Sequence, residues 1–221
     1  MSYGLRLAII DSDELVREGR VLLLQAQPET QIVYQSGEAN QSLESVVDYL
    51  LDVVLVDTRI PGWVATDFIS ELGAKLDAAG NEAQILALAS FGSNEFELAC
   101  LRAGAAAFVT NEQGVTALLR KLRELGSGEK SIVRSHLDSL LAEVDGNPAP
   151  HPGLAMSLGS MDLNQLGVLK AMLEGLSDTQ IARNLELTKY RVSKFIETLR
   201  ISSGFRTRTQ LAIELIGLGV S

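Results

Sequence analysis

The first half of the chain alternates between two patterns of apolar residues. Short runs of consecutive apolar positions are typical of strands buried on both faces. Between these runs, apolar residues recur every three or four positions, which predicts amphipathic helices. The runs predict strands at 5–10, 32–34, 53–56, 85–89 and 107–109, and the stretches after them predict helices at 14–25, 41–50, 66–78, 95–103 and 115–125. Five strand-helix repeats favour an α/β fold, a doubly wound five-stranded parallel sheet with helices on both faces.

A change of pattern marks a second domain. Three of the five prolines lie within 145–153, a segment that cannot sustain a helix or a central strand. Beyond it we expect four short helices and no strand. We therefore predict a domain at 1–128, a linker at 129–154 that contains a helix at 131–144 and the proline-rich hinge, and an all-α domain at 155–221.

Within the all-α domain, polar residues mark where helices begin. Ser177 is followed three residues later by Gln180, which is the spacing of a capping box, and Thr207 is followed by Gln210 in the same way. Thr188 precedes the helix predicted at 189–201. A short helix and tight turn at 181–188, followed by this longer helix, predict a helix-turn-helix.

Candidate chemistry lies where the predicted strands end. The first strand is followed by Asp11, Ser12 and Asp13, the third strand by Asp57, and the fourth strand ends at Ala89. Because parallel strands bring their carboxyl ends to the same edge of a sheet, we expect these carboxylates to share one crevice.

Charge separates the two predicted domains. The chain has a formal net charge of −9, but residues 1–154 hold 11 basic and 22 acidic side chains, whereas residues 155–221 hold 8 and 6. Seven basic and two acidic residues fall within 183–208, on the predicted helix-turn-helix. This local excess of positive charge predicts a double-stranded DNA partner, although a solvated helix face with ion pairs would produce a similar run.

Composition excludes several classes of protein. No run approaches the roughly 18 apolar residues of a membrane helix, and the amino terminus carries no cleavage signature, so we expect a cytoplasmic protein without a membrane partner. Cys100 is the only cysteine, which excludes an internal disulfide and a cysteine-based metal cluster.

Two sets of motifs resemble a known family. The segments 9–11, 15–19, 53–62 and 101–105 are similar to the receiver domain of bacterial response regulators, which has a flavodoxin-like fold. The segments 174–177, 180–182 and 206–212 resemble the LuxR-type DNA-binding domain. Their order along the chain is that of the NarL/FixJ family of two-component transcription regulators.

The resemblance implies a phosphorylation pocket, from which this sequence departs. In that family a histidine kinase transfers a phosphoryl group to an aspartate, here Asp57, with help from Mg²⁺ held by an acidic pair, a hydroxyl and a Lys. At the matching positions this chain has Ser12 in place of the second acid, Ala89 in place of the hydroxyl residue and Asn111 in place of the Lys. We expect Phe108, the switch aromatic of the family, to be a core residue here because its usual hydroxyl partner is Ala89.

We therefore interpret the first domain as an atypical receiver that controls dimerisation and DNA binding without conventional phosphorylation, with Asp11, Asp57 and Mg²⁺ forming at most a weak metal site. It would respond to a small molecule or a protein, or dimerise constitutively, and a histidine kinase would be a partner if Asp57 is phosphorylated. The alternative is an ordinary regulator activated at Asp57, in which Asp13 and Ser90 replace the displaced groups. We do not expect an enzyme, since a phosphatase with nucleophilic Asp57 needs an acid two residues later, where this chain has Arg59. A pure interaction module also remains open.

The predicted recognition helix turns its apolar residues Val192, Ile196 and Leu199 toward the domain core. The remaining face would read DNA, with Lys194 donating to guanine or phosphate and Glu197 suited to cytosine amino groups. The full set of predicted DNA contacts is Thr188, Lys189, Tyr190, Arg191, Ser193, Lys194, Glu197, Arg200, Arg206 and Arg208. Because one small domain makes few phosphate contacts, we expect a homodimer, with Ile213, Ile216 and Leu218 of the last helix in the dimer contact.

Overall fold

In a computed structural model of the chain, the described residues are 4–126, 137, 140, 141, 154, 157, 158, 161–218 and 220. The chain divides into two compact units, residues 1–127 and 128–221. Of the helix predicted at 131–144, only residues 137, 140 and 141 are described, and all three are helical. The proline-rich segment 145–153 lies outside the described residues.

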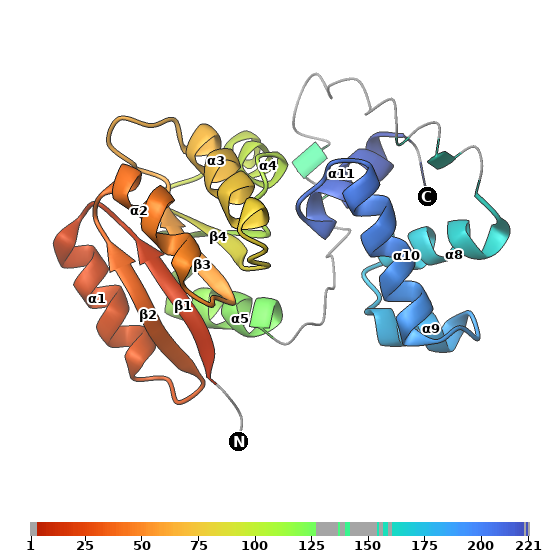
Figure 1. The fold of residues 1–221 in the computed structure, drawn as a ribbon, viewed down its shortest axis with the longest axis horizontal. Helices are drawn as coiled ribbons and strands as arrows, with labels where there is room; N and C mark the ends of the chain where they lie inside the picture. Colours follow the sequence, from red (N-terminus) through yellow and green to blue (C-terminus); the bar gives the residue numbers. More distant parts are fainter. Residues whose placement is uncertain are drawn as a thin grey trace. The chain divides into compact units, whose positions relative to one another are not determined.

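The first unit is a five-stranded parallel sheet in the order β2-β1-β3-β4-β5, which confirms the predicted architecture (Figure 1). Strand β3 lies at its centre, and all five residues of this strand are buried. This explains why its sequence is apolar on both faces. The strands are β1 (Leu5–Ile10), β2 (Thr30–Ser36), β3 (Val53–Asp57), β4 (Gln84–Ala89) and β5 (Ala107–Thr110).

Helices cover both faces of the sheet. One face packs against α1 and α5, and its core joins Leu7 and Leu55 of the strands to Leu24 and Leu122 of these helices. The other face is covered by α2, α3 and α4 (Figure 1). The helices are α1 (Glu14–Gln25), α2 (Ala39–Ser45), α3 (Ala65–Ala78), α4 (Asn94–Arg102) and α5 (Gly114–Gly126), with two 3₁₀ turns, η1 (Val46–Asp48) and η2 (Asn111–Gln113).

One predicted helix is shorter than expected. The prediction at 41–50 is replaced by α2, which ends at Ser45, and by the turn η1. The adjacent β-branched residues Val46 and Val47 disfavour a continued α-helix. Tyr49 then adopts an extended backbone, and its ring lies 5.2 Å from that of Tyr34 in β2. The helix therefore ends early at a point where the extended backbone lets Tyr49 pack against Tyr34.

The second unit consists, among its described residues, of helices α8 (Leu163–Leu173), α9 (Asp178–Asn184), α10 (Lys189–Ser202) and α11 (Arg208–Gly217). Both predicted capping boxes are present, at Ser177 and at Thr207, and Thr188 caps α10 by accepting a hydrogen bond from the main chain. The predicted helix-turn-helix is thus α9 and α10. Among the residues that the structure describes, no helix is both long and apolar enough to cross a membrane.

Candidate functional site

Strand periodicity brings three polar residues to the same side of the sheet. Along β1 and β3, the odd-numbered residues face α1 and α5, as Leu7 and Leu55 do. Asp57 ends β3 in this alternation, and Asp11 follows β1 on the same side. Asn111 directly follows β5 and begins η2. The expected convergence of polar groups at the carboxyl ends of the strands is therefore found on the face that α1 covers.

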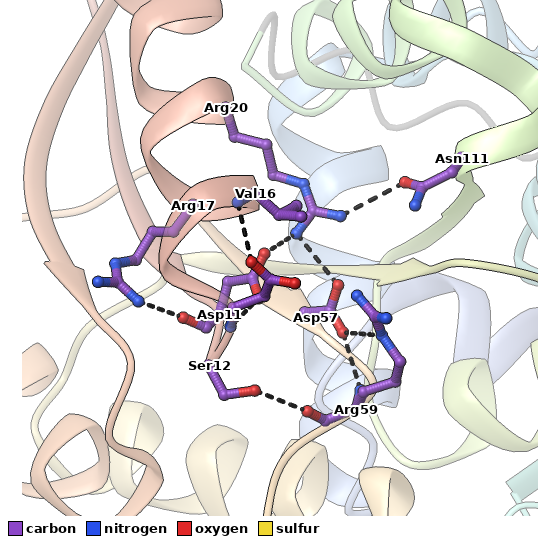
Figure 2. A network of polar contacts seen from close by, with 9 residues as sticks. Asp11, Ser12, Val16, Arg17, Arg20, Asp57, Arg59 and Asn111 are labelled. Carbon is purple, nitrogen blue, oxygen red and sulfur yellow. Dashed lines mark hydrogen bonds and ion pairs between the residues drawn. The ribbon is translucent and has the colours of Figure 1, made fainter.

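Arg20 of α1 reaches into this group of residues (Figure 2). Its Nη1 donates to Oδ2 of Asp11 and, over 3.1 Å, to Oδ2 of Asp57. Its Nη2 lies 3.4 Å from Oδ1 of Asn111. The Arg20 side chain is only 10% exposed and the two carboxylates only 1% each. One guanidinium thus joins α1 to the ends of β1 and β3 and to the residue after β5. We call Asp11, Arg20, Asp57 and Asn111 the Arg20 cluster.

The second oxygen of Asp57 is also engaged. Oδ1 accepts a hydrogen bond from the main-chain N–H of Arg59 at 2.9 Å and another from its Nε at 3.2 Å. The Arg59 side chain is 54% exposed, so its ion pair is weaker than the buried one. Its hydrogen bond to Asp57 raises the pKa of the Arg59 guanidinium. Both oxygens of the residue that resembles a phosphoacceptor are therefore already hydrogen-bonded.

Burial shapes the acidity of Asp11. Loss of solvent raises the pKa of this carboxyl above its ordinary value, while the main-chain N–H of Asp13 acts in the opposite direction. Repulsion by Asp57 raises it further, and Arg20 and Arg59 lower it. Two carboxylates this close together need a cation between them, and Arg20 provides it.

The other predicted pocket residues lie around the Arg20 cluster without joining it. Ser12 is exposed, and its hydroxyl donates to the carbonyl oxygen of Arg59. Asp13 is the N-cap of α1, where its side chain accepts from Val16 N–H. This occupies the carboxylate that the alternative hypothesis assigned to Mg²⁺.

On the opposite side of the pocket, Ala89 is buried and offers only a methyl group. Phe108 is 5% exposed and packs edge-on against Phe96, with ring centroids 5.8 Å apart. A Cβ on Gly92 would come within 2.9 Å of the Phe108 ring, so the loop after β4 closes over it. Phe108 is therefore a core residue, as expected from the missing hydroxyl at Ala89.

The resemblance implies Mg²⁺ at this pocket, and the residues do not fit that ion. Within the described parts of the chain, no three His, Cys, Asp or Glu side chains gather as metal ligands. Asp11 and Asp57 converge, but the guanidinium of Arg20 lies between them. Mg²⁺ requires near-octahedral oxygen ligands, and a guanidinium supplies none.

Sequence reasoning missed Arg20, although its position carried a signal. The buried residues of α1 are Arg20, Val21 and Leu24. Arg20 and Leu24 are four residues apart and therefore share one helix face. A charged residue on the apolar face of a predicted helix is an indication that it pairs with a buried opposite charge.

The ten predicted DNA-binding residues divide into an exposed group, a group bonded within the unit and two further residues. Five of them are exposed side chains of α10, where Val192, Ile196 and Leu199 are buried as expected. Tyr190 is 75% exposed, so its ring is available to a partner. The exposed group is Lys189, Tyr190, Arg191, Lys194 and Glu197.

The second group holds the unit together. Arg208, expected at the DNA backbone, is instead buried and forms an ion pair with Asp178 of α9, whose other oxygen accepts from Ser193 of α10 at 2.6 Å. Burial lowers the pKa of Arg208. Arg200 donates to the main-chain oxygens of Phe205, at 2.8 Å, and Arg206.

Of the two remaining predicted residues, Thr188 is exposed and caps α10, and Arg206 is half-buried. Ile213, expected in a dimer contact, is only 1% exposed, so its side chain is not available for such a contact. Ile216 and Leu218 remain half-buried.

No protein-family model matches the chain. It is 27% identical to the DNA-binding transcriptional activator DevR/DosR of Mycobacterium tuberculosis over 93% of this chain and 91% of that protein. It is 22% identical to the nitrate/nitrite response regulator NarL of Escherichia coli over 93% of this chain and 92% of NarL. A solved structure of two RcsB dimers bound to two parallel DNAs has the same fold, with a TM-score of 0.55, 16% identity and coverage of 97% and 99% of the two chains.

Proposed function

From the premise that the chain is a response regulator of the NarL/FixJ type, we propose that it is a dimeric DNA-binding transcription regulator whose receiver acts without conventional phosphorylation of Asp57. The proposal depends mainly on one observation, the exposed basic face of α10. Lys189, Arg191 and Lys194 project from a helix whose other face is packed into its unit. Such a helix can enter a major groove without unfolding any part of its domain.

The residues of this face suit distinct parts of a DNA site. Lys194, near the middle of α10, would reach base edges or phosphate, and Glu197, one turn later, would accept from cytosine. Lys189 and Arg191 at the start of the helix would contact phosphates, which position the domain without reading sequence. Arg208 and Arg200 have no such role in this proposal because their guanidiniums are already bonded within the unit.

Dimerisation follows from the small number of phosphate contacts. Three exposed basic residues on one helix release few counterions, so a single copy would bind weakly at physiological salt. Two copies on neighbouring half-sites would multiply their affinities. The RcsB structure on DNA contains dimers, which supports the same arrangement here.

The absence of conventional phosphorylation is inferred from the receiver pocket. Asn111 and Ala89 lack the charge and the hydroxyl that would hold a phosphoryl group, and both oxygens of Asp57 are engaged. We propose that the input is instead a small molecule, a protein or constitutive dimerisation, acting in the cytoplasm. An input of this kind shifts the population of the DNA-binding dimer only by its difference in affinity for the two states.

Genomic footprinting with the purified full-length protein tests both parts. We expect the wild type to protect DNA sites that each consist of two half-sites. The Lys194→Ala variant should lose this protection, whereas Lys170→Ala, which removes the same charge from α8, should retain it. We also expect Asp57→Asn to protect the same sites as the wild type. If no duplex is bound at low salt, the DNA-binding role is wrong, and if Asp57→Asn loses its sites, the receiver depends on that carboxylate.

A further inference from the structure

We infer that Arg20 is a permanent, covalently tethered cation that occupies the place of Mg²⁺ in the receiver pocket and makes the pocket independent of metal. This inference rests on the proposed receiver without conventional phosphorylation, and it names the residue that closes the pocket. Its first support is the geometry, since a single nitrogen, Nη1 of Arg20, donates to both Asp11 and Asp57. That nitrogen lies where a cation shared by the two carboxylates would lie.

The second support is the charge balance of the pocket. A receiver of the resembled type gathers an acidic pair, an acceptor aspartate and one Lys, which leaves an excess of negative charge that a divalent ion neutralises. Here Ser12 has replaced one acid, and Asn111 has replaced the Lys. The remaining carboxylates, Asp11 and Asp57, are matched by Arg20 and Arg59. The pocket is therefore neutral with the side chains of this chain alone.

The third support is the way in which α1 holds Arg20 in place. Its neighbours on the helix, Val21 and Leu24, are buried in the core against the sheet. A Mg²⁺ ion would have to shed water and also displace a guanidinium that is nine-tenths buried. The displaced guanidinium has no deprotonated form near neutral pH, so it would remain as a second positive charge beside the ion.

Asn111 completes the arrangement. An amide oxygen accepts from Nη2 of Arg20, whereas the Lys expected at this position in the resembled family would repel the guanidinium. The replacement of that Lys by Asn111 and the presence of Arg20 on α1 are thus two parts of one change. Neither is explained by a pocket that still needs Mg²⁺.

Arg17 supplies a matched control on the same helix. It is one turn before Arg20 and carries the same charge, but it donates to the main-chain oxygen of Asp11 at 2.7 Å and not to a carboxylate. Its removal changes the total charge of the protein in the same way as removal of Arg20 while leaving the carboxylates paired.

The test is a titration of the full-length protein with MgCl₂, in which binding is measured by calorimetry and by the fluorescence of Trp63. Trp63 lies six residues after Asp57, and its indole N–H donates a hydrogen bond to Asn40. We expect no saturable binding at millimolar Mg²⁺ in the wild type or in Arg17→Ala. In Arg20→Met we expect saturable millimolar binding and a melting temperature that rises with Mg²⁺.

Two results would overturn the inference: saturable Mg²⁺ binding by the wild type, or an Arg20→Met protein that folds without gaining any. If Arg20→Met does not fold, Arg20→Gln carries the same expectation, because its neutral amide still donates to a carboxylate. DNA binding is measured on the same samples. A wild type that binds both DNA and Mg²⁺ refutes only the role of Arg20, whereas one that binds neither refutes the proposed DNA-binding function and leaves the role of Arg20 intact.

Discussion

Removing the cation of the Arg20 cluster should cost the receiver more stability than removing one of its acids. Arg20→Met keeps most of the apolar stem but leaves Asp11 and Asp57 side by side, with only the half-exposed Arg59 as a counter-charge. Breaking a buried ion pair in this way costs about 3–5 kcal/mol. In Asp57→Asn, Arg20 still pairs with Asp11, and the lost charge-assisted hydrogen bonds are worth about 1.5–3 kcal/mol.

The two changes should also be coupled. Once Arg20 is absent, Asp57→Asn removes one of two adjacent buried carboxylates that only Arg59 then balances, so the double variant should be more stable than Arg20→Met alone. A coupling of about 0.5–3 kcal/mol is expected for residues in direct contact. The receiver unit of 127 residues has a stability of roughly 6–19 kcal/mol by size, so each variant should still fold.

Urea unfolding followed by Trp63 fluorescence measures these costs, because Trp63 is the only tryptophan and reports on the receiver unit alone. The Arg17→Ala variant controls for loss of a positive charge from α1. Since the pair is buried, the cost of Arg20→Met should persist at high salt. The reasoning would be refuted if the free energy of unfolding of Arg20→Met lay within about 1 kcal/mol of the wild-type value, or if Arg20→Met lost less stability than Asp57→Asn.

Four further predictions follow from the same structure. Lys194→Ala should weaken DNA binding and reduce the slope of log affinity against log salt by about 0.9 for each lost phosphate contact, in anisotropy titrations in which Lys170→Ala behaves as the wild type. Arg208→Met should destabilise the second unit by about 3–5 kcal/mol, seen as faster hydrogen exchange in α9 and α10; unchanged exchange would show that the Asp178 pair is dispensable. Burial raises the pKa of Cys100 to about 12, so the native thiol should resist disulfide reagents at pH 8 and react only on unfolding; rapid labelling of native protein would contradict this. Burial raises the pKa of Asp11, so the folded state holds this proton more tightly than the unfolded state does. The contribution of Asp11 to the free energy of unfolding should therefore decline as the pH rises from about 3.8 through the raised pKa. This decline should be absent when the free energy of unfolding of Asp11→Asn is measured against pH.

The pattern of residues along the chain is enough to predict the helices and strands and the fold class of each unit. The strands could be predicted within a few residues from their short runs of apolar residues. The helix α1 could be predicted from its apolar spacing of three to four residues, and the starts of α9 and α10 from their capping residues. The same holds for the buried face of α10. The departures of Ser12, Ala89 and Asn111 from the resembled family were likewise visible in the residues themselves.

Which charged side chains form pairs depends instead on how distant parts of the chain pack together. Arg20 lies 37 residues from Asp57 and 91 from Asn111, and nothing local in the chain indicates that one guanidinium joins them. The same is true of Arg208 and Asp178, which are 30 residues apart and turn a predicted DNA contact into an internal ion pair. The apolar neighbours of Arg20 on α1 indicate that it is buried, but they do not indicate which acids it meets, because the choice of partner depends on long-range packing.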